Sequence, residues 1–207
     1  IEGRRVSAVK IIDGRLRWPV PTTLIKSLPG QRVSGIERRG KYLLLELDKG
    51  HLLVHLGMTG TLRILPSREI LKTHDRVTIE FGDLSLRLHD PRKFGAVLWH
   101  PKSKGPIEQN ALLQKLGVEP FSPEFSGGLG AQVLYQHSRK RSIAVKQFLL
   151  AGQAVVGVGN IYCSESLFEA GIHPEKSAGK LTRPQCIRLA NAVRSILQKA
   201  IDAAKGD

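Results

Sequence analysis

The chain has 207 residues, 41% hydrophobic and 24% charged, which is the composition of a globular protein and excludes a disordered one. Lys and Arg number 32 against 18 Asp and Glu, so the formal net charge is +14, which favours nucleic acid as partner while leaving ribosomal and membrane-surface proteins open. No apolar run is long enough for a membrane span or a signal peptide, so we expect a cytoplasmic protein with no membrane partner.

The first half of the chain consists of short runs of β-branched and aliphatic residues that are broken by Gly, Pro and Asp. This pattern predicts short strands and an antiparallel sandwich or barrel. Asp48-Lys49-Gly50 and Gly82-Asp83 are typical of hairpin turns. The composition of residues 101–106 is typical of a linker. Strands are expected at Val6–Ile12, Tyr42–Leu47, Leu52–His55, Val77–Phe81, Leu84–His89 and Ala96–Trp99.

Beyond the linker the hydrophobic period changes from two to about 3.6, which predicts helices. Three of them stop near a glycine: Glu108–Leu116, Ser142–Leu150 and Asn160–Ala170. A long amphipathic helix should follow Thr182 as its N-cap, with Pro184 in the first turn. Its apolar stripe would comprise Ile187, Ala190, Val193, Ile196, Leu197 and Ile201.

Two turns, around His173-Pro174 and Gly179, separate the last two helices. The fold class is therefore α+β, an N-terminal antiparallel β-sandwich followed by an α-helical domain with a helix-two-turn-helix motif. We expect the first domain over residues 1–104 and the second over residues 105–207, with the motif at about 156–204.

The two cysteines, Cys163 and Cys186, lie far apart in the sequence, and the chain has no CxxC motif. Free, partly buried thiols are therefore expected rather than a disulfide or a metal site.

Three segments of the first half carry residues suited to nucleic acid. Lys41 stands where an apolar strand begins, so its ammonium is positioned to pair with a phosphate or to transfer protons; a solvated strand end is the alternative. In His55-Leu56-Gly57-Met58-Thr59-Gly60 the methionine sits in a tight turn, from which it can wedge between base pairs or pack into the core.

The third segment, Asp90-Pro91-Arg92-Lys93-Phe94-Gly95, also follows a strand and presents a cation two residues from an aromatic ring. Arginine can take the place of an extruded base by bonding to its partner, while phenylalanine stacks beside it. Alone, the segment would indicate only a turn with a solvated arginine.

The helical half adds positive charge and a helix start. Ser138-Arg139-Lys140-Arg141 precedes the helix that contains Lys146, a concentration of charge suited to phosphates, although such runs are also common on solvated faces. Val156–Tyr162 brings two glycines and Asn160 to a helix N-terminus, where backbone N–H groups favour an anion; a plain helix cap is the alternative.

In this order the motifs closely resemble bacterial formamidopyrimidine-DNA glycosylase, an 8-oxoguanine DNA glycosylase and AP lyase, from about Gly3 to Asp207. Met58 together with the Asp90–Gly95 loop distinguishes this branch from the related endonuclease VIII branch. The resemblance implies a monomeric base-excision-repair enzyme that acts on double-stranded DNA containing oxidised purines or abasic sites, in bacterial cytoplasm at the nucleoid. It would excise 8-oxoguanine and formamidopyrimidines and nick the strand by β,δ-elimination.

The resemblance also implies residue roles. Lys41 would contact phosphate and assist β-elimination. The backbone of the damaged strand would be held by His55, His74, Arg141, Lys146 and Asn160, and the void left by the extruded nucleotide would be filled by Met58, Arg92 and Phe94, with Arg92 also contacting DNA.

Two family features have no counterpart in the printed sequence. The family starts with a helix opening Pro-Glu, whose proline amine attacks the sugar, and ends in a zinc hairpin held by four cysteines, whereas this sequence starts at Ile1 and has two cysteines. We expect a glycosylase fragment, truncated at both ends, that binds no zinc or other cofactor and is inactive as printed. A short DNA-binding protein without catalysis is the alternative, and a basic RNA-binding protein the more distant one.

Overall fold

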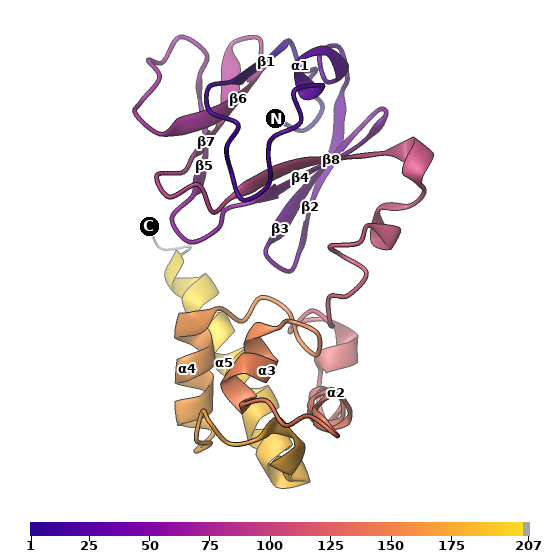
Figure 1. The fold of residues 1–207 in the computed structure, drawn as a ribbon, viewed down its shortest axis with the longest axis vertical. Coiled ribbons are helices and arrows are strands. Elements are labelled where there is room, and N and C mark those ends of the chain that lie inside the picture. Colours follow the sequence, from indigo (N-terminus) through magenta and orange to yellow (C-terminus); the bar gives the residue numbers. More distant parts are fainter. Residues whose placement is uncertain (205–207) are drawn as a thin grey trace. The chain divides into compact units, whose positions relative to one another are not determined.

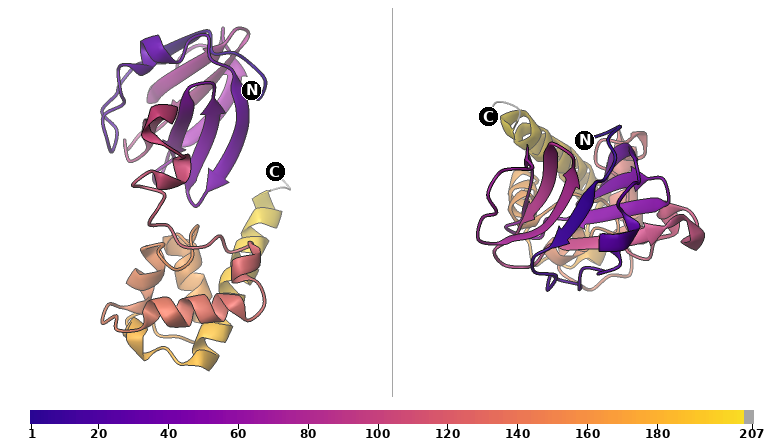
Figure 2. Two further views of the ribbon diagram at one scale, coloured as in Figure 1. Left: turned by 90° about the vertical axis from the view of Figure 1, so that its right-hand side faces the viewer. Right: turned by 90° about the horizontal axis from the view of Figure 1, so that it is seen from above.

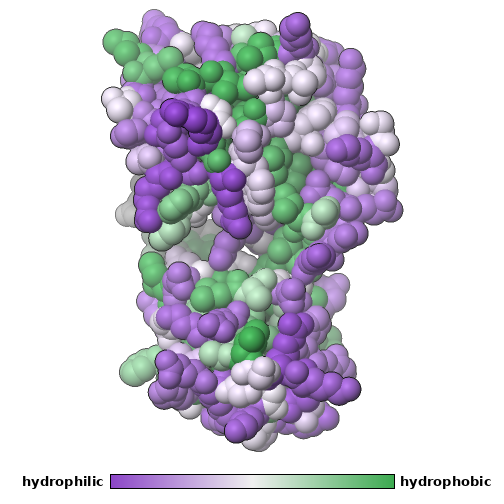
Figure 3. All heavy atoms as spheres, viewed as in Figure 1, coloured by the Kyte–Doolittle hydropathy of each residue, from purple (hydrophilic) through white to green (hydrophobic). Residues whose placement is uncertain are grey.

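The computed structural model describes residues 1–204. The chain divides into two compact units, Ile1–Leu113, called the β unit below, and Gln114–Asp207, called the helical unit. The domain boundary expected after residue 104 stays a prediction. No helix in the described part of the chain is long and apolar enough to cross a bilayer. Hydrophilic side chains interspersed with apolar ones cover the visible face of each unit (Figure 3).

The β unit is a sandwich of two four-stranded antiparallel sheets with the orders β1-β6-β7-β5 and β2-β3-β4-β8 (Figures 1 and 2). Their inner faces enclose an apolar core that includes Val9 and Ile79 from the first sheet and Leu45 and Leu52 from the second. The strands are β1 Ala8–Ile11, β2 Val33–Arg39, β3 Tyr42–Leu47, β4 Gly50–His55, β5 Thr61–Pro66, β6 Asp75–Phe81, β7 Leu84–His89 and β8 Ala96–Pro101. A four-residue helix, α1 Leu24–Ser27, follows β1.

The six predicted strands and both hairpin turns are present, and two strands were missed. Both missed strands, β2 and β5, lie at sheet edges, where only part of each strand is buried. Gly35 interrupts the alternation of β2, and Pro66 ends β5. Edge strands tolerate Gly and Pro because one side of their backbone needs no partner strand, so their sequence pattern is weak.

The helical unit contains α2 Leu129–Ser138, α3 Val145–Leu150, α4 Asn160–Glu169 and α5 Arg183–Ala204, coloured pink to yellow in Figure 1. Their apolar faces meet in a second core that includes Leu134, Phe148, Leu167 and Val193. The turns between α4 and α5 include the short 3-10 helix Ala178–Lys180, so the helix-two-turn-helix motif is present.

The helix predicted at Glu108–Leu116 is wrong: the structure has a 3-10 turn, Ile107–Gln109, followed by irregular turns. Asn110 explains this difference. Its side-chain oxygen accepts the N–H of Leu112, and its Nδ2 lies 3.2 Å from Nδ1 of His100, so local and tertiary bonds replace the helical ones. The missed helix α2 has Gly128 as its N-cap, without a side-chain cap, so the sequence carries no start signal for it.

Two predicted helices differ in detail. The helix expected from Ser142 begins at Val145, because Ala144 has extended backbone angles and pairs with Ser177 in an isolated bridge. In α5 the predicted stripe is only partly buried: Ala190, Val193 and Leu197 lie in the core, while Ile187 and Ile201 are exposed. Cys186 and Leu189 take the buried positions instead, and both cysteines of the chain are buried thiols that form no disulfide.

Candidate nucleic-acid interface

Two loops of the β unit meet backbone to backbone. Gly57 has a φ of +66°, and a Cβ on it would lie 2.5 Å from the carbonyl carbon of Phe94. A Cβ on Gly95 would lie 2.8 Å from the carbonyl oxygen of His55. Neither position has room for a side chain, so glycine is what allows the loop after β4 to pack on the loop after β7.

The side chains at the tips of these two loops point to solvent although they are large and apolar. Met58 is 68% exposed and Phe94 is 44% exposed. The Arg92 guanidinium carbon lies 4.8 Å from the centroid of the Phe94 ring, a cation–π arrangement. Core packing, the alternative considered for Met58, is therefore wrong, and the three predicted void-filling residues are carried by loops in contact.

The buried side chain of Asp90 holds the Asp90–Gly95 loop in place. Its side chain is fully buried, and Oδ2 accepts the N–H of Gly95 at 2.7 Å. Its Oδ1 lies 3.5 Å from the Thr59 hydroxyl, which belongs to the first loop. One buried carboxylate thus closes the Asp90–Gly95 loop and links it to the loop of Met58.

His55 stands at the end of β4, with its ring 5.0 Å from that of Tyr42. Its Nδ1 accepts the N–H of Gly57 at 2.9 Å, which places the ring proton of neutral imidazole on Nε2. Partial burial lowers the pKa of His55, and the positive charges of Arg17 and Lys41 lower it further. His55 therefore offers an N–H donor of the kind that a phosphate oxygen accepts.

His74 precedes β6, is exposed, and has a φ of +76°, which is unusual for a residue with a side chain. Its Nδ1 lies 3.0 Å from Nη2 of Arg76. A guanidinium only donates, so Nδ1 accepts and the His74 ring proton also lies on Nε2. Both predicted backbone contacts of the β unit thus present the same donor atom.

Lys41 lies in the turn between β2 and β3 and is exposed. Gly40 before it has a φ of +58°, and its carbonyl accepts a bond of 2.9 Å from Nη1 of Arg38. The turn is therefore hydrogen-bonded to a side chain of β2, so the backbone that carries Lys41 is held in place.

In the helical unit, α4 begins at the exposed Asn160. The N-cap is Gly159, which has no side chain to cap the helix, so the segment Val156–Tyr162 starts a helix as expected. The first N–H groups of a helix have no partner within the helix, and with the helix dipole they favour an anion.

Arg141 and Lys146 lie on the segment that runs into α3. Arg141 is exposed, and its Nη2 donates to Oε1 of Gln153 at 3.1 Å. Lys146 is half-buried in the first turn of α3, and its carbonyl oxygen lies 3.7 Å from Sγ of Cys163 in α4. This contact brings the start of α3 against the first turn of α4, so two positive side chains and a helix start belong to one part of the helical unit.

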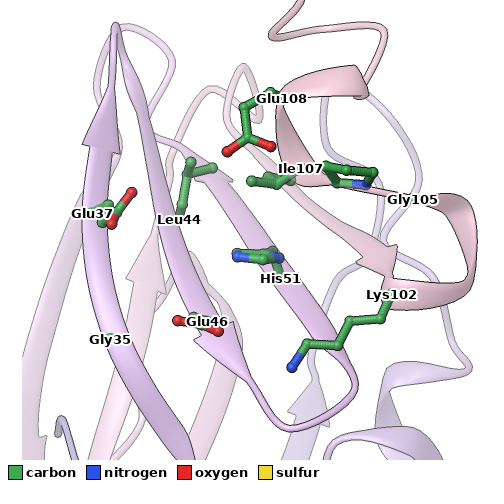
Figure 4. Close-up of a pocket in the computed structure, with 10 residues that line it drawn as sticks. Gly35, Glu37, Leu44, Glu46, His51, Lys102, Gly105, Ile107 and Glu108 are labelled. Atoms are coloured by element: carbon green, nitrogen blue, oxygen red, sulfur yellow. The ribbon is translucent and has the colours of Figure 1, made fainter.

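A cavity of about 450 Å³ in the β unit lies against β2, β3 and β4 and is lined by none of the predicted site residues (Figure 4). Glu37, Glu46 and Glu108 surround it with His51 and Lys102. Three carboxylates repel phosphate, so this face is not suited to DNA.

The described residues do not fit the zinc that the family resemblance implies. Cys163 and Cys186 are buried in the helical core, and nowhere in residues 1–204 does a group of three or more His, Cys, Asp and Glu side chains lie as a metal site would require.

Sequence reasoning missed two residues of this site, Arg76 and Asp13. Arg76 contacts His74 and the backbone of the Asp90–Gly95 loop, and Asp13 pairs with Arg76 at 3.3 Å and with Lys93 at 2.7 Å. No local motif marks either residue, because the partners that link them to the Asp90–Gly95 loop lie far away in the sequence.

Comparisons with known proteins match both units of the chain to one family. A family model described as formamidopyrimidine-DNA glycosylase N-terminal domain matches residues 1–97, and one described as formamidopyrimidine-DNA glycosylase H2TH domain matches residues 116–207. The chain is 83% identical over 203 residues to a formamidopyrimidine-DNA glycosylase of Polynucleobacter necessarius and 52% identical over 204 residues to one of Burkholderia cenocepacia. Each alignment covers 98% of this chain and 73% of the relative.

Solved structures of the Lactococcus lactis protein are similar as well. One, bound non-covalently to DNA with an AP site, superposes with a TM-score of 0.86 at 32% identity and covers 98% of this chain and 76% of that one. Another, in complex with DNA that contains Fapy-dG, gives a TM-score of 0.86 at 33% identity and covers 98% of this chain and 74% of that one.

Proposed function

The chain belongs to the formamidopyrimidine-DNA glycosylase family, and from this premise we propose that it recognises oxidised purines in duplex DNA by extruding the damaged nucleotide. The observation that carries the proposal is the pair of packed loops that present Met58, Arg92 and Phe94 to solvent. Large apolar side chains that are exposed on ordered loops commonly mark a binding surface. Between the bases of an opened stack such side chains are removed from water.

In this proposal Met58 and Phe94 occupy the gap in the stack, and Arg92 bonds to the base that has lost its partner. The ring of Phe94 holds the Arg92 guanidinium at 4.8 Å, so the cation is ordered before DNA arrives. Ordering it in advance reduces the entropy cost of binding.

The backbone of the damaged strand is held by His55 and His74 of the β unit and by Arg141, Lys146 and Asn160 of the helical unit. The two histidines donate from Nε2, and the start of α4 supplies backbone N–H groups with no side-chain cap. Relatives of this chain have been crystallised with DNA that contains an AP site or Fapy-dG, which supports these lesions as ligands.

For the chemistry we propose the family's bifunctional reaction. A proline amine displaces the base from the sugar and forms a Schiff base, and elimination then expels the phosphates on either side. Lys41, exposed on its turn, assists by stabilising the leaving phosphate. The site of action is chromosomal DNA in the bacterial cytoplasm, and the enzyme acts as a monomer.

Covalent trapping tests the catalytic part. A 207-residue polypeptide made as printed has the primary amine of Ile1 at its terminus, so we expect no adduct with a lesion duplex under borohydride. An adduct would contradict this and would identify the amine of Ile1 or of Lys41 as a substitute nucleophile. Lesion binding without an adduct agrees with a DNA-binding body that lacks this chemistry.

The substitution Arg92→Ala tests the recognition part. We expect affinity for an abasic-analogue duplex to fall about tenfold, while affinity for undamaged duplex changes less than about twofold, because Arg92 acts at the vacated base. Both dissociation constants are measured by fluorescence anisotropy. Arg68→Ala, an exposed arginine on the loop after β5, is the control for a lost positive charge. Equal losses on both duplexes would reduce Arg92 to a phosphate contact.

A further inference from the structure

We propose that Arg76 is a positioning residue that couples His74, the predicted phosphate contact, to the loop that carries Arg92 and Phe94. The inference rests on the proposed function for the roles of those three residues. It goes beyond that function because the proposed function gives the buried Arg76 no contact with DNA. The coupling is made by one guanidinium that bonds to both segments.

Arg76 is buried, with 10% of its side chain exposed, and its guanidinium has four partners. Nε donates to the carbonyl of Asp90 at 2.8 Å, and Nη2 to the carbonyl of Pro91 at 3.3 Å. Nη2 also lies 3.0 Å from Nδ1 of His74, and Nη1 lies 3.3 Å from Oδ2 of Asp13. The planar fork of arginine supplies donors in these directions at once, which the single ammonium of lysine does not.

The strand is distorted where Arg76 stands. The pairing of β6 with β7 shifts register between Asp75 and Val77, which marks a β-bulge at Arg76. The carbonyl of Arg76 accepts the N–H groups of Ile12 and Asp13, so the bulge is held from the side of β1 as well. Bulges redirect a side chain out of the sheet alternation, here toward the Asp90–Gly95 loop.

Backbone strain is concentrated at the two ends of the same network. Among residues 1–204 three residues other than glycine have a positive φ: His74 at 76°, Lys93 at 63° and Lys140 at 59°. His74 accepts from Arg76, and Lys93 pairs with Asp13 at 2.7 Å. Strained backbone persists only where surrounding contacts over-determine it, and here Arg76 and Asp13 provide those contacts.

Asp13 completes the network without depending on Arg76. Its carboxylate also binds Arg15 through two bonds, Nε at 2.9 Å and Nη2 at 3.0 Å. The bonds from Arg15 and then from Lys93 hold the pKa of Asp13 well below its usual range. Removing Arg76 therefore leaves Asp13 with two cationic partners, so the removal tests the guanidinium itself rather than a stranded buried carboxylate.

The contact with His74 has a consequence for DNA binding. Because Arg76 occupies Nδ1, the ring proton of His74 is fixed on Nε2, where it can donate to a phosphate oxygen. Without Arg76 the neutral ring divides between two tautomers and rotates more freely. The phosphate contact and the void-filling loop would then no longer be ordered by one group.

The chain offers a matched control for a merely structural arginine. Arg87 lies on β7 of the same sheet and is fully buried. It donates to the carbonyls of Ser67, Glu69 and Ile70, all on the loop between β5 and β6. Its Nη1 also lies 3.9 Å from Oδ2 of Asp75, whose carboxylate keeps Arg63 at 3.1 Å when Arg87 is removed. Arg87→Met should therefore cost stability as Arg76→Met does, and it should leave lesion recognition in place.

The test compares Arg76→Met, Arg87→Met and Arg92→Ala in the 207-residue chain by their dissociation constants for an abasic-analogue duplex and for the undamaged duplex. We expect Arg76→Met to reduce the ratio of the two constants about tenfold and Arg87→Met to change it less than about twofold. Arg76→Met combined with Arg92→Ala should lose less than the product of the single losses, because both act through one loop. A parent-like ratio in Arg76→Met, or an equal loss in Arg87→Met, overturns the proposal.

A second measurement separates this proposal from the proposed function. ¹⁵N NMR of the imidazole without DNA should show His74 as the Nε2–H tautomer in the parent and as a mixture in Arg76→Met. Unchanged His74 signals overturn the coupling whatever the DNA result, whereas a normal lesion preference in Arg92→Ala overturns the proposed function alone. If Arg76→Met does not fold, Arg76→Lys keeps the charge near Asp13 but not the fork, and a parent-like ratio there overturns the proposal equally.

Discussion

In the β unit the predicted lesion contacts sit on loops that buried side chains hold in place, whereas in the helical unit two predicted phosphate contacts, Lys146 and Asn160, sit in the first turns of helices. Asp90 and Arg76 are buried beneath the Arg92 loop and bond to its backbone. Asn160 stands at the start of α4, capped by a glycine, and its position follows from the helix itself.

The difference matches the tasks that the two sets would perform. A side chain that replaces an extruded base must be placed within a fraction of an ångström, which requires its loop to be over-determined. A phosphate contact tolerates more freedom, because a helix start and a nearby cation attract an anion over a broad range of positions. We therefore expect changes beneath the Arg92 loop to alter specificity and stability, and changes at the start of α4 to alter affinity.

The largest effect should follow from Asp90→Ala. It removes a buried acceptor from the N–H of Gly95 and from the Thr59 hydroxyl, so we expect the β unit to lose about 3 kcal/mol of unfolding free energy. Both tryptophans, Trp18 and Trp99, lie in the β unit, so urea denaturation followed by tryptophan fluorescence reports on this unit selectively.

Asp83→Ala is the control for Asp90→Ala. Asp83 is an exposed carboxylate of the same unit that pairs with Arg4 on the surface, and its loss should cost less than about 1 kcal/mol. A stability loss in Asp90→Ala no larger than in Asp83→Ala would show that the loop does not depend on its buried carboxylate. The contrast between the two units would then fail.

A smaller effect is expected in the helical unit. Lys146→Ala should weaken binding to damaged and undamaged duplex alike, about fivefold, and should lower the slope of log Kd against log salt by about one, as the loss of one phosphate contact does. Arg92→Ala should leave the slope nearly unchanged. Titrations at a series of salt concentrations measure both slopes, and a lesion-selective loss in Lys146→Ala would contradict the division of tasks.

The sequence predicted the parts of the site whose determinants are local. Gly57 and Gly95 stand in short loops after apolar strands, and Asn160 follows two glycines before an amphipathic helix, so each pattern carries its own signal. The exposure of Met58 was not decided by its motif, because a methionine after a strand packs inward as readily as it points outward.

The supporting residues could not be found in this way. Arg76 lies just before the predicted strand Val77–Phe81, and its bonds to Asp13 and Pro91 span 63 and 15 positions of the sequence. The same limit explains Asn110, whose bond to His100 replaced a predicted helix with turns. Periodicity reports which face of an element is apolar, and it is silent about a single polar side chain that bridges two segments.

The smallest effect concerns the pH dependence of the stability of the β unit. The pKa of His55 is lowered from its usual 6.5, mainly by burial, so as pH falls below 6.5 the unfolded chain binds a proton before the folded chain does. The stability that this neutral histidine contributes is fully present above pH 6.5 and is lost as the pH falls toward the folded pKa. His55→Gln should therefore reduce the loss of β-unit stability between pH 7.5 and 5.5, by a few tenths of a kcal/mol since the ring is partly exposed. Urea denaturation followed by tryptophan fluorescence at both pH values gives the unfolding free energies. For the parent and for His55→Gln, the value at pH 5.5 is compared with the same protein's value at pH 7.5. An unchanged or steeper loss in His55→Gln would mean that other groups set the acid sensitivity of the β unit.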